Sequence, residues 1–104
     1  MEIRILPQVA RELADVPKNL NENIFGVLQR LEKGENIPMP LCRPLFGIEK
    51  GLYELRFSHQ SGEWRVFYFI KVMDAIYVLH AMKKKTQKMD RRVLNLLRSR
   101  IRSL

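Results

Sequence analysis

The spacing of apolar residues along the chain changes from a helical repeat to a strand repeat. After a short alternating segment, EIRIL, Pro7 suits a first helical turn and residues 7–16 are predicted to form a short helix. A longer helix is predicted to follow and to end at Gly34, because apolar residues recur there every three or four positions: Leu20, Ile24, Val27, Leu28 and Leu31. The segment NIPMPLCRPLFG then indicates a proline-rich loop.

From Leu52 the apolar period becomes two. The runs LYELRFS, WRVFYFI and AIYVLHAM are predicted to form strands, and the short turns between them should make neighbours antiparallel. Asp90 is expected to cap a last helix with an apolar stripe at Val93, Leu97, Ile101 and Leu104. The predicted fold class is α+β: one domain, residues 1–104, ordered β-α-α-β-β-β-α, with an antiparallel sheet of three to four strands.

Side-chain parity predicts which residues share a face of the sheet. Turns centred on Ser61-Gly62 and Met73-Asp74 would pair Phe67 with both Arg56 and His80. One face would then carry Glu54, Arg56, Arg65, Phe67, His80 and Lys84. The other, lying against the N-terminal helices, would carry Tyr53, Leu55, Phe57, Val66, Tyr68, Leu79 and Ala81. The polar face is open to two interpretations: salt bridges between Glu54 and either arginine, or a phosphate site.

Charge is distributed unevenly along the chain. The first 82 residues contain ten Lys/Arg and ten Asp/Glu, whereas residues 83–104 contain nine and one, so the formal charge of +8 resides in the last 22 residues. Such a basic segment is typical of proteins that bind nucleic acid or an acidic protein; alternatively, it is a solvated tail without a partner. A single cysteine, no long apolar run and no secretory signal lead us to expect a cytoplasmic protein without a membrane segment.

One arginine of the predicted C-terminal helix falls on the apolar side of that helix. Arg91, Arg98 and Arg102 fall opposite the apolar stripe, but Arg100 falls within it. Its side chain is expected either to snorkel past the helix edge or to reach a carboxylate or phosphate.

Three consecutive segments carry a resemblance to a known family. GLYELRFS, GEWRVFYFI and LHAMKKKTQK, followed by a basic helix, resemble the HigB-like, phage-derived branch of the RelE/ParE toxin superfamily. The resemblance is tight over residues 51–88, and the N-terminal half matches only as a helical hairpin. It implies a curved sheet with two helices on one face, and a toxin of a bacterial type II toxin–antitoxin pair. RelE and HigB types cleave mRNA in the ribosomal A site, whereas ParE types poison DNA gyrase.

The resemblance also implies site residues. The ELR motif falls on Glu54 to Arg56, the arginine of the second motif is Arg65, and the third motif covers His80, Lys84 and Lys85. The helix arginine corresponds to Arg100. Two departures stand out: Met82 replaces the usual Phe, and Met89-Asp90 replaces the usual Thr-Pro before the last helix.

These residues suggest metal-free and cofactor-free cleavage through the RNA 2′-OH. Arg56 and Arg65 would clamp the phosphate, Lys84 would bind it or act as base, and Glu54 would orient Arg56 or act as base. His80 would transfer a proton, or it is simply packed in the sheet. RNA binding is expected from Lys83, Lys85, Lys88, Arg91, Arg98 and Arg100.

The expected partners are a cognate helix-turn-helix antitoxin, the ribosome and mRNA. The alternatives are a ParE-like gyrase inhibitor and a non-catalytic, phage-derived RNA-binding protein.

Overall fold

The structure, a computed structural model, describes residues 1–71, 75–85 and 88–104. Their elements follow in the order β1 (Glu2–Ile5), α1 (Pro7–Ala14), α2 (Lys18–Glu32), β2 (Cys42–Pro44), β3 (Leu52–His59), β4 (Gly62–Ile70), β5 (Ala75–Lys83) and α3 (Arg91–Arg102). The α+β class and the predicted order of helices and strands are confirmed, with β2 as an addition.

The sheet has five strands in the order β1-β5-β4-β3-β2, whereas three to four strands were predicted. The additional strand lies in the proline-rich segment predicted to be a loop, where Cys42 pairs with Leu55 and Pro44 with Tyr53. Proline is tolerated because β2 is an edge strand and leaves one side unpaired. At the opposite edge β1 is parallel to β5, which departs from the predicted antiparallel sheet. The β3–β4 and β4–β5 pairs are antiparallel as predicted.

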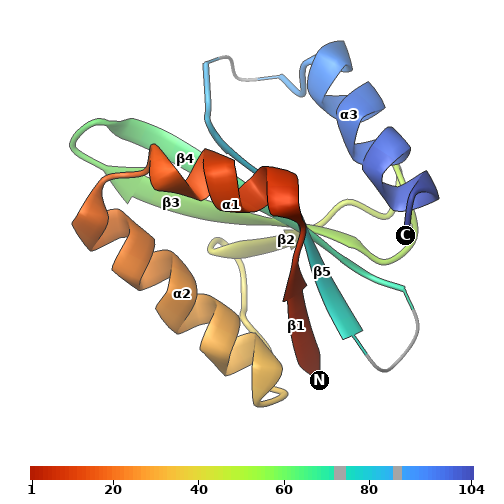
Figure 1. The fold of residues 1–104 in the computed structure, drawn as a ribbon, viewed down its shortest axis with the longest axis horizontal. Coiled ribbons are helices and arrows are strands. Elements are labelled where there is room, and N and C mark those ends of the chain that lie inside the picture. The colour runs from red at the N-terminus through yellow and green to blue at the C-terminus, as the bar shows by residue number, and fades with distance from the viewer. Residues whose placement is uncertain (72–74, 86–87) are drawn as a thin grey trace.

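Two apolar clusters lie on opposite faces of the sheet. Helices α1 and α2 cover one face, as predicted, and α3 packs at the other (Figure 1). Val9, Leu13 and Ile24 belong to the first cluster together with Leu55 and Val66. The second, smaller cluster brings the fully buried Leu97 of α3 against Leu52, Phe67, Phe69 and Leu79.

The β3–β4 turn lies one residue earlier than predicted. His59 pairs with Gly62, so the two-residue loop is Gln60-Ser61 and Arg56 lies opposite Arg65 instead of Phe67. The imidazole Nδ1 of His59 accepts from the Ser61 amide at 3.0 Å, a local bond that favours this position of the turn. Because the loop still has an even number of residues, the predicted faces of β3 and β4 are unchanged.

Between β4 and β5 the register is as predicted only on one side of a bulge. Phe67 lies opposite His80 and Arg65 opposite Met82, although the predicted turn on Met73-Asp74 lies outside the described residues. The register then shifts between Phe67 and Tyr68, so that Tyr68 lies opposite Val78. The extra residue turns Leu79 to the α3 face, where it packs in the second cluster. Its predicted place against the N-terminal helices is therefore wrong.

The helix ends follow their predicted signals. Pro7 begins α1, Gly34 follows α2 with a positive φ of 86°, and Asp90 Oδ1 accepts from the Arg92 amide at 2.8 Å. Within the described part of the chain, no helix has both the length and the apolar character needed to cross a membrane.

Candidate functional site

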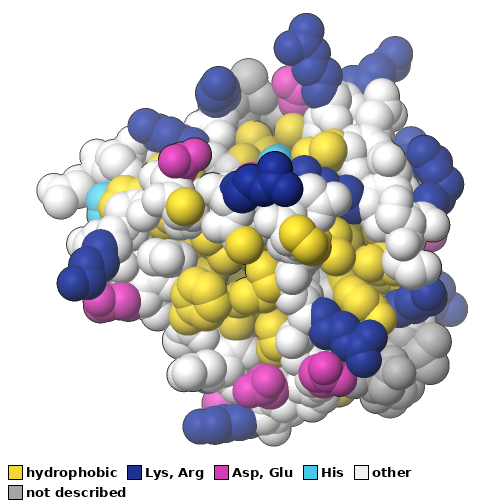
Figure 2. Space-filling view, in the orientation of Figure 1, with side chains coloured by type: hydrophobic (Ala, Val, Ile, Leu, Met, Phe, Trp, Pro, Cys, Tyr) yellow, Lys and Arg dark blue, Asp and Glu magenta, His cyan; other side chains and the backbone are white. Residues whose placement is uncertain are grey.

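A pocket of about 310 Å³ opens on the α3 side of the sheet, at the segment that leads from β5 into α3. Six cationic side chains line it: Arg43, Arg56, Arg65, Lys84, Lys85 and Lys88. Two carboxylates, Glu54 and Asp90, and six apolar side chains complete the wall: Leu45, Ile48, Phe67, Met82, Met89 and Val93. By contrast, Figure 2 shows Lys and Arg dispersed among other side chains over the face that carries α1 and α2.

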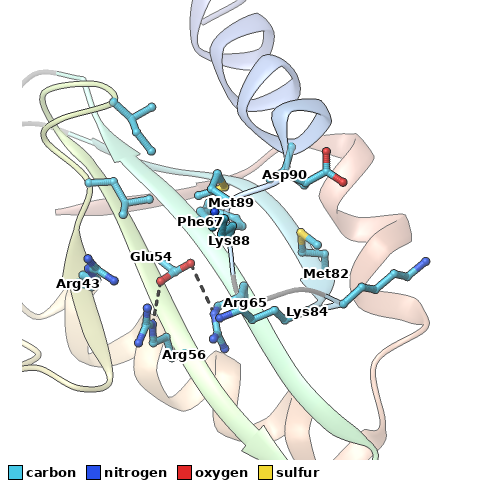
Figure 3. Close-up of a pocket in the computed structure, with 14 residues that line it drawn as sticks. Arg43, Glu54, Arg56, Arg65, Phe67, Met82, Lys84, Lys88, Met89 and Asp90 are labelled. Atoms are coloured by element: carbon cyan, nitrogen blue, oxygen red, sulfur yellow. Dashed lines mark hydrogen bonds and ion pairs between the residues drawn. The ribbon is translucent and has the colours of Figure 1, made fainter.

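One buried carboxylate holds two arginines at the base of this pocket (Figure 3). Arg56 Nε donates to Glu54 Oε1 at 2.8 Å, and Arg65 Nε lies 3.5 Å from Glu54 Oε2. Glu54 is 7% exposed, and a charge at that depth needs such partners. The salt-bridge interpretation of the sequence is thus confirmed, with both arginines instead of one.

The two arginines differ in how far a ligand could reach them. Arg65 is 4% exposed, and it also donates to Glu63 at 3.0 Å and to the Trp64 carbonyl at 3.3 Å. The side chain of Arg56 is 35% exposed, and its guanidinium is bonded to Glu54. Arg56 is therefore the accessible guanidinium of the pair, and Arg65 is largely engaged by the protein.

The lysines reach the pocket as the chain leaves β5. The amide of Lys84 donates to the Glu63 carbonyl at 2.7 Å, which extends the sheet pairing by one residue. Lys84, Arg56 and Arg65 also line a second, more open hollow of about 430 Å³. These three cations therefore form a wall shared by two adjoining cavities. Lys83, at the end of β5, is exposed and does not line the pocket.

The structure places His80 outside the pocket. Its Nδ1 donates to Glu12 Oε2 at 2.9 Å, and its ring stacks on Phe67 with centroids 6.2 Å apart. Burial lowers the pKa of His80, opposed by the Glu12 carboxylate and assisted by Arg100. Of the two roles that the sequence left open, this geometry favours a packed histidine.

Arg100 belongs to the same cluster. Its Nη1 donates to Glu12 Oε2 at 3.1 Å and to the Leu79 carbonyl at 2.6 Å. Of the two alternatives expected for Arg100, the structure shows the reach to a carboxylate, and the side chain does not snorkel to solvent. Arg91 and Arg98 are exposed on α3 and, like Arg100, do not line the pocket.

Sequence reasoning missed Glu12 and Arg43. Glu12 lies one position from the buried Leu13 in α1, and nothing in the local pattern distinguishes it from a solvated helix residue. It also accepts from the Ala81 amide at 3.1 Å, on the part of β5 beyond its pairing with β1. Arg43 carried a weak signal, as a single cation in an otherwise apolar, proline-rich segment.

The opposite face of the sheet holds Tyr68. Tyr68 is buried as predicted, and its hydroxyl lies 3.3 Å from Cys42 Sγ. Burial raises the pKa of Tyr68. Among the described residues, no three His, Cys, Asp or Glu side chains are grouped so that they could hold a metal ion.

Comparison with solved structures defines the fold. The chain is similar to a double arginine-to-alanine mutant of the E. coli toxin RelE in the free state, with a TM-score of 0.56, 15% identity and 96% of each chain covered. It is also similar to the isolated E. coli RelE toxin in a P21 crystal form, with a TM-score of 0.53, 15% identity and coverage of 96% of this chain and 97% of that one. The fold is therefore that of RelE.

The family follows from the sequence match. Residues 11–102 match the family described as phage-derived protein Gp49-like (DUF891), and the chain belongs to this family. Comparison with curated proteins gave no significant match. The predicted resemblance is thus confirmed as membership of a phage-derived family and as a RelE-like fold.

Proposed function

We propose that this protein is the toxin of a type II toxin–antitoxin system and that it cleaves mRNA on the ribosome. The observation that carries the proposal is the cationic pocket, in which Arg56 is oriented by a buried carboxylate beside Lys84. Arginine and lysine are the side chains that bind phosphate groups most strongly, and the RelE fold supports the same function.

The chemistry that suits these side chains is attack of the 2′-oxygen on the neighbouring phosphorus. The 2′-OH loses its proton to a base, the O2′–P bond forms, the P–O5′ bond breaks, and the 5′-oxygen takes up a proton. The products are a 2′,3′-cyclic phosphate and a 5′-hydroxyl. Arg56 would stabilise the charge of the pentacoordinate phosphate, and Lys84 would bind the phosphate or take the proton.

Arg65 and Glu54 act in this proposal mainly through Arg56. Arg65 adds positive potential beneath the phosphate, although its burial limits direct contact. Glu54 uses both oxygens to hold the two arginines, which makes it an orienting residue rather than the base. His80 is left out, because Glu12 engages its Nδ1 and it does not line the pocket.

The partners follow from the charge. Lys83, Lys85, Arg91 and Arg98 are exposed and would contact ribosomal RNA, where phosphate contacts add salt-sensitive affinity. A helix-turn-helix antitoxin with acidic residues would cover the same cations. Cytoplasmic localisation is part of the proposal, because ribosomes are the target.

Translation of a defined mRNA by purified ribosomes tests the function, with primer extension to map the transcript 5′ ends. We expect new 5′ ends only when protein, ribosomes and mRNA are all present. Gyrase-dependent double-strand breaks in DNA with intact mRNA would instead favour a ParE-like inhibitor. Tight RNA binding with undiminished translation would favour a non-catalytic RNA-binding protein.

A further inference from the structure

The pocket has one end with the arginine pair and Lys84, here called the cationic end, and one end toward α3 where apolar side chains gather beside Lys88, here called the apolar end. Arg56, Arg65 and Lys84 lie at the end that adjoins the second hollow. Figure 3 shows Phe67 and Met89 nearer the start of α3 than this arginine pair. The phosphate chemistry proposed above uses only the cationic end, so it does not explain the apolar one.

The apolar end is built from partly exposed side chains that come from separate elements. Ile48 belongs to the loop after β2, Met82 to β5, and Met89 and Val93 to the segment that begins α3. All four are intermediate in burial, and the fully buried Phe67 lies behind them in β4. These residues therefore form a partly open apolar wall in the same pocket as Arg56, Arg65 and Lys84.

A nucleotide has the matching distribution of polarity. Its base is flat and largely apolar on both faces, and its phosphate is anionic. Proteins commonly bind single-stranded RNA by stacking its unstacked bases on aromatic or arginine side chains, and thioether side chains also pack favourably on aromatic rings. A volume of about 310 Å³ lies at the small end for ligand pockets, which suits one nucleotide better than a peptide segment.

We propose that the apolar end is a nucleobase subsite. One base of the RNA would pack against Met82 and Met89, with its phosphate directed to Arg56 and Lys84. This inference rests on the proposed function for its choice of RNA as the ligand. It adds a direct contact between the protein and a nucleobase.

The subsite is expected to bind bases with little discrimination. Both oxygens of Glu54 are engaged by arginines, and Asp90 Oδ1 accepts from the Arg92 amide. Packing of a base on apolar side chains is tolerant of sequence, because every base offers a similar face. Adenosine, guanosine, cytidine and uridine 5′-monophosphates should therefore bind with affinities within about tenfold of one another.

Methionine methyl resonances provide a direct test. The protein is labelled at the methionine methyl groups and titrated separately with the four 5′-monophosphates and with ribose 5-phosphate. Aromatic ring currents should shift the Met82 and Met89 methyl signals with the nucleotides and much less with ribose 5-phosphate. Met39, which is 68% exposed and does not line the pocket, is the internal control. Equal shifts with ribose 5-phosphate, or none with any nucleotide, would overturn the inference.

Two variants separate the base from the phosphate. Met89→Ala should weaken nucleotide binding about fivefold to tenfold while leaving the affinity for ribose 5-phosphate unchanged. Arg56→Ala should weaken both ligands, and Met39→Ala should weaken neither. Ile48→Ala provides a second test of the apolar wall if Met89→Ala perturbs the fold. An unchanged nucleotide affinity in both folded apolar variants contradicts the subsite.

The two proposals fail in distinguishable ways. Ribosome-dependent cleavage without the methyl shifts would support the proposed function and contradict the base subsite. Nucleotide-specific shifts in a protein that does not cut mRNA would support the subsite and remove the nuclease.

Discussion

Arg56 and Arg65 lie directly opposite each other on β3 and β4, and both guanidinium groups interact with the carboxylate of Glu54. Two cations at facing positions would otherwise repel each other across the sheet. The single buried carboxylate offsets this repulsion and fixes Arg56 in the wall of the pocket. A phosphate arriving there meets donors that are already in place, which is the arrangement expected of electrostatic catalysis.

Replacing the accessible arginine should abolish activity without unfolding the protein. Arg56→Ala is expected to lower ribosome-dependent mRNA cleavage about 10²- to 10³-fold, because it removes a donor to the developing phosphate charge. Cleavage is measured by primer extension and folding by circular dichroism. Arg30→Ala makes the same charge change at a surface pair with Glu35, and it should retain full activity. Wild-type cleavage by Arg56→Ala would show that the active site lies elsewhere.

Replacing the buried arginine should instead reduce stability. Arg65→Ala is expected to lower the free energy of unfolding by about 3 kcal/mol, because it leaves Glu54 buried with one partner fewer. Arg56→Ala should cost less than about 1 kcal/mol, as its side chain is partly solvated. Urea denaturation of the two variants checks the difference. Equal losses would mean that the contrast in burial has no energetic consequence.

His80 should make stability depend on pH. Because burial lowers its pKa in the folded protein, the unfolded chain binds a proton first as the pH falls below about 6.5. The free energy of unfolding should therefore fall from about pH 8 to about pH 5.5, more steeply in the parent than in His80→Asn. Identical slopes in the two proteins would argue against the contribution of His80.

The docking of α3 should depend on one leucine. Leu97 is fully buried against the sheet, so Leu97→Ala is expected to cost about 3 kcal/mol of stability. Leu94 is only partly buried and belongs to neither apolar cluster, so Leu94→Ala should cost less than about 1 kcal/mol. Denaturant unfolding measures both variants. Similar losses would mean that α3 packs differently.

Binding to single-stranded RNA should depend on salt in proportion to the lysines that contact phosphate. Lys84→Gln and Lys85→Gln should each reduce by about 0.7 the slope of the logarithm of affinity against the logarithm of salt concentration. Lys18→Gln, at the start of α2, is the control and should leave that slope unchanged. Fluorescence anisotropy with a labelled oligoribonucleotide measures the three variants. A slope that does not change in Lys84→Gln would remove this residue from the phosphate contacts.

The sequence determined most of the elements and most of the sheet faces, because these depend on local periodicity. The period of two from Leu52 onward predicted three strands and placed Glu54, Arg56 and Arg65 on one surface, and local signals at Gly34 and Asp90 predicted the helix ends. The family resemblance depended on the same short segments and was confirmed by the match to the Gp49-like family.

Tertiary structure decided what depends on contacts between distant segments. A bulge opposite Phe67 reversed Leu79, and pairing with β3 made a strand of residues 42–44. Glu12, 68 residues from His80, drew that imidazole and Arg100 into a cluster outside the pocket. The apolar end of the pocket likewise joins a loop, a strand and a helix start. The alternation of side chains depends on residues that are neighbours in the sequence. A hydrogen bond or packing contact between distant segments forms only when the chain folds.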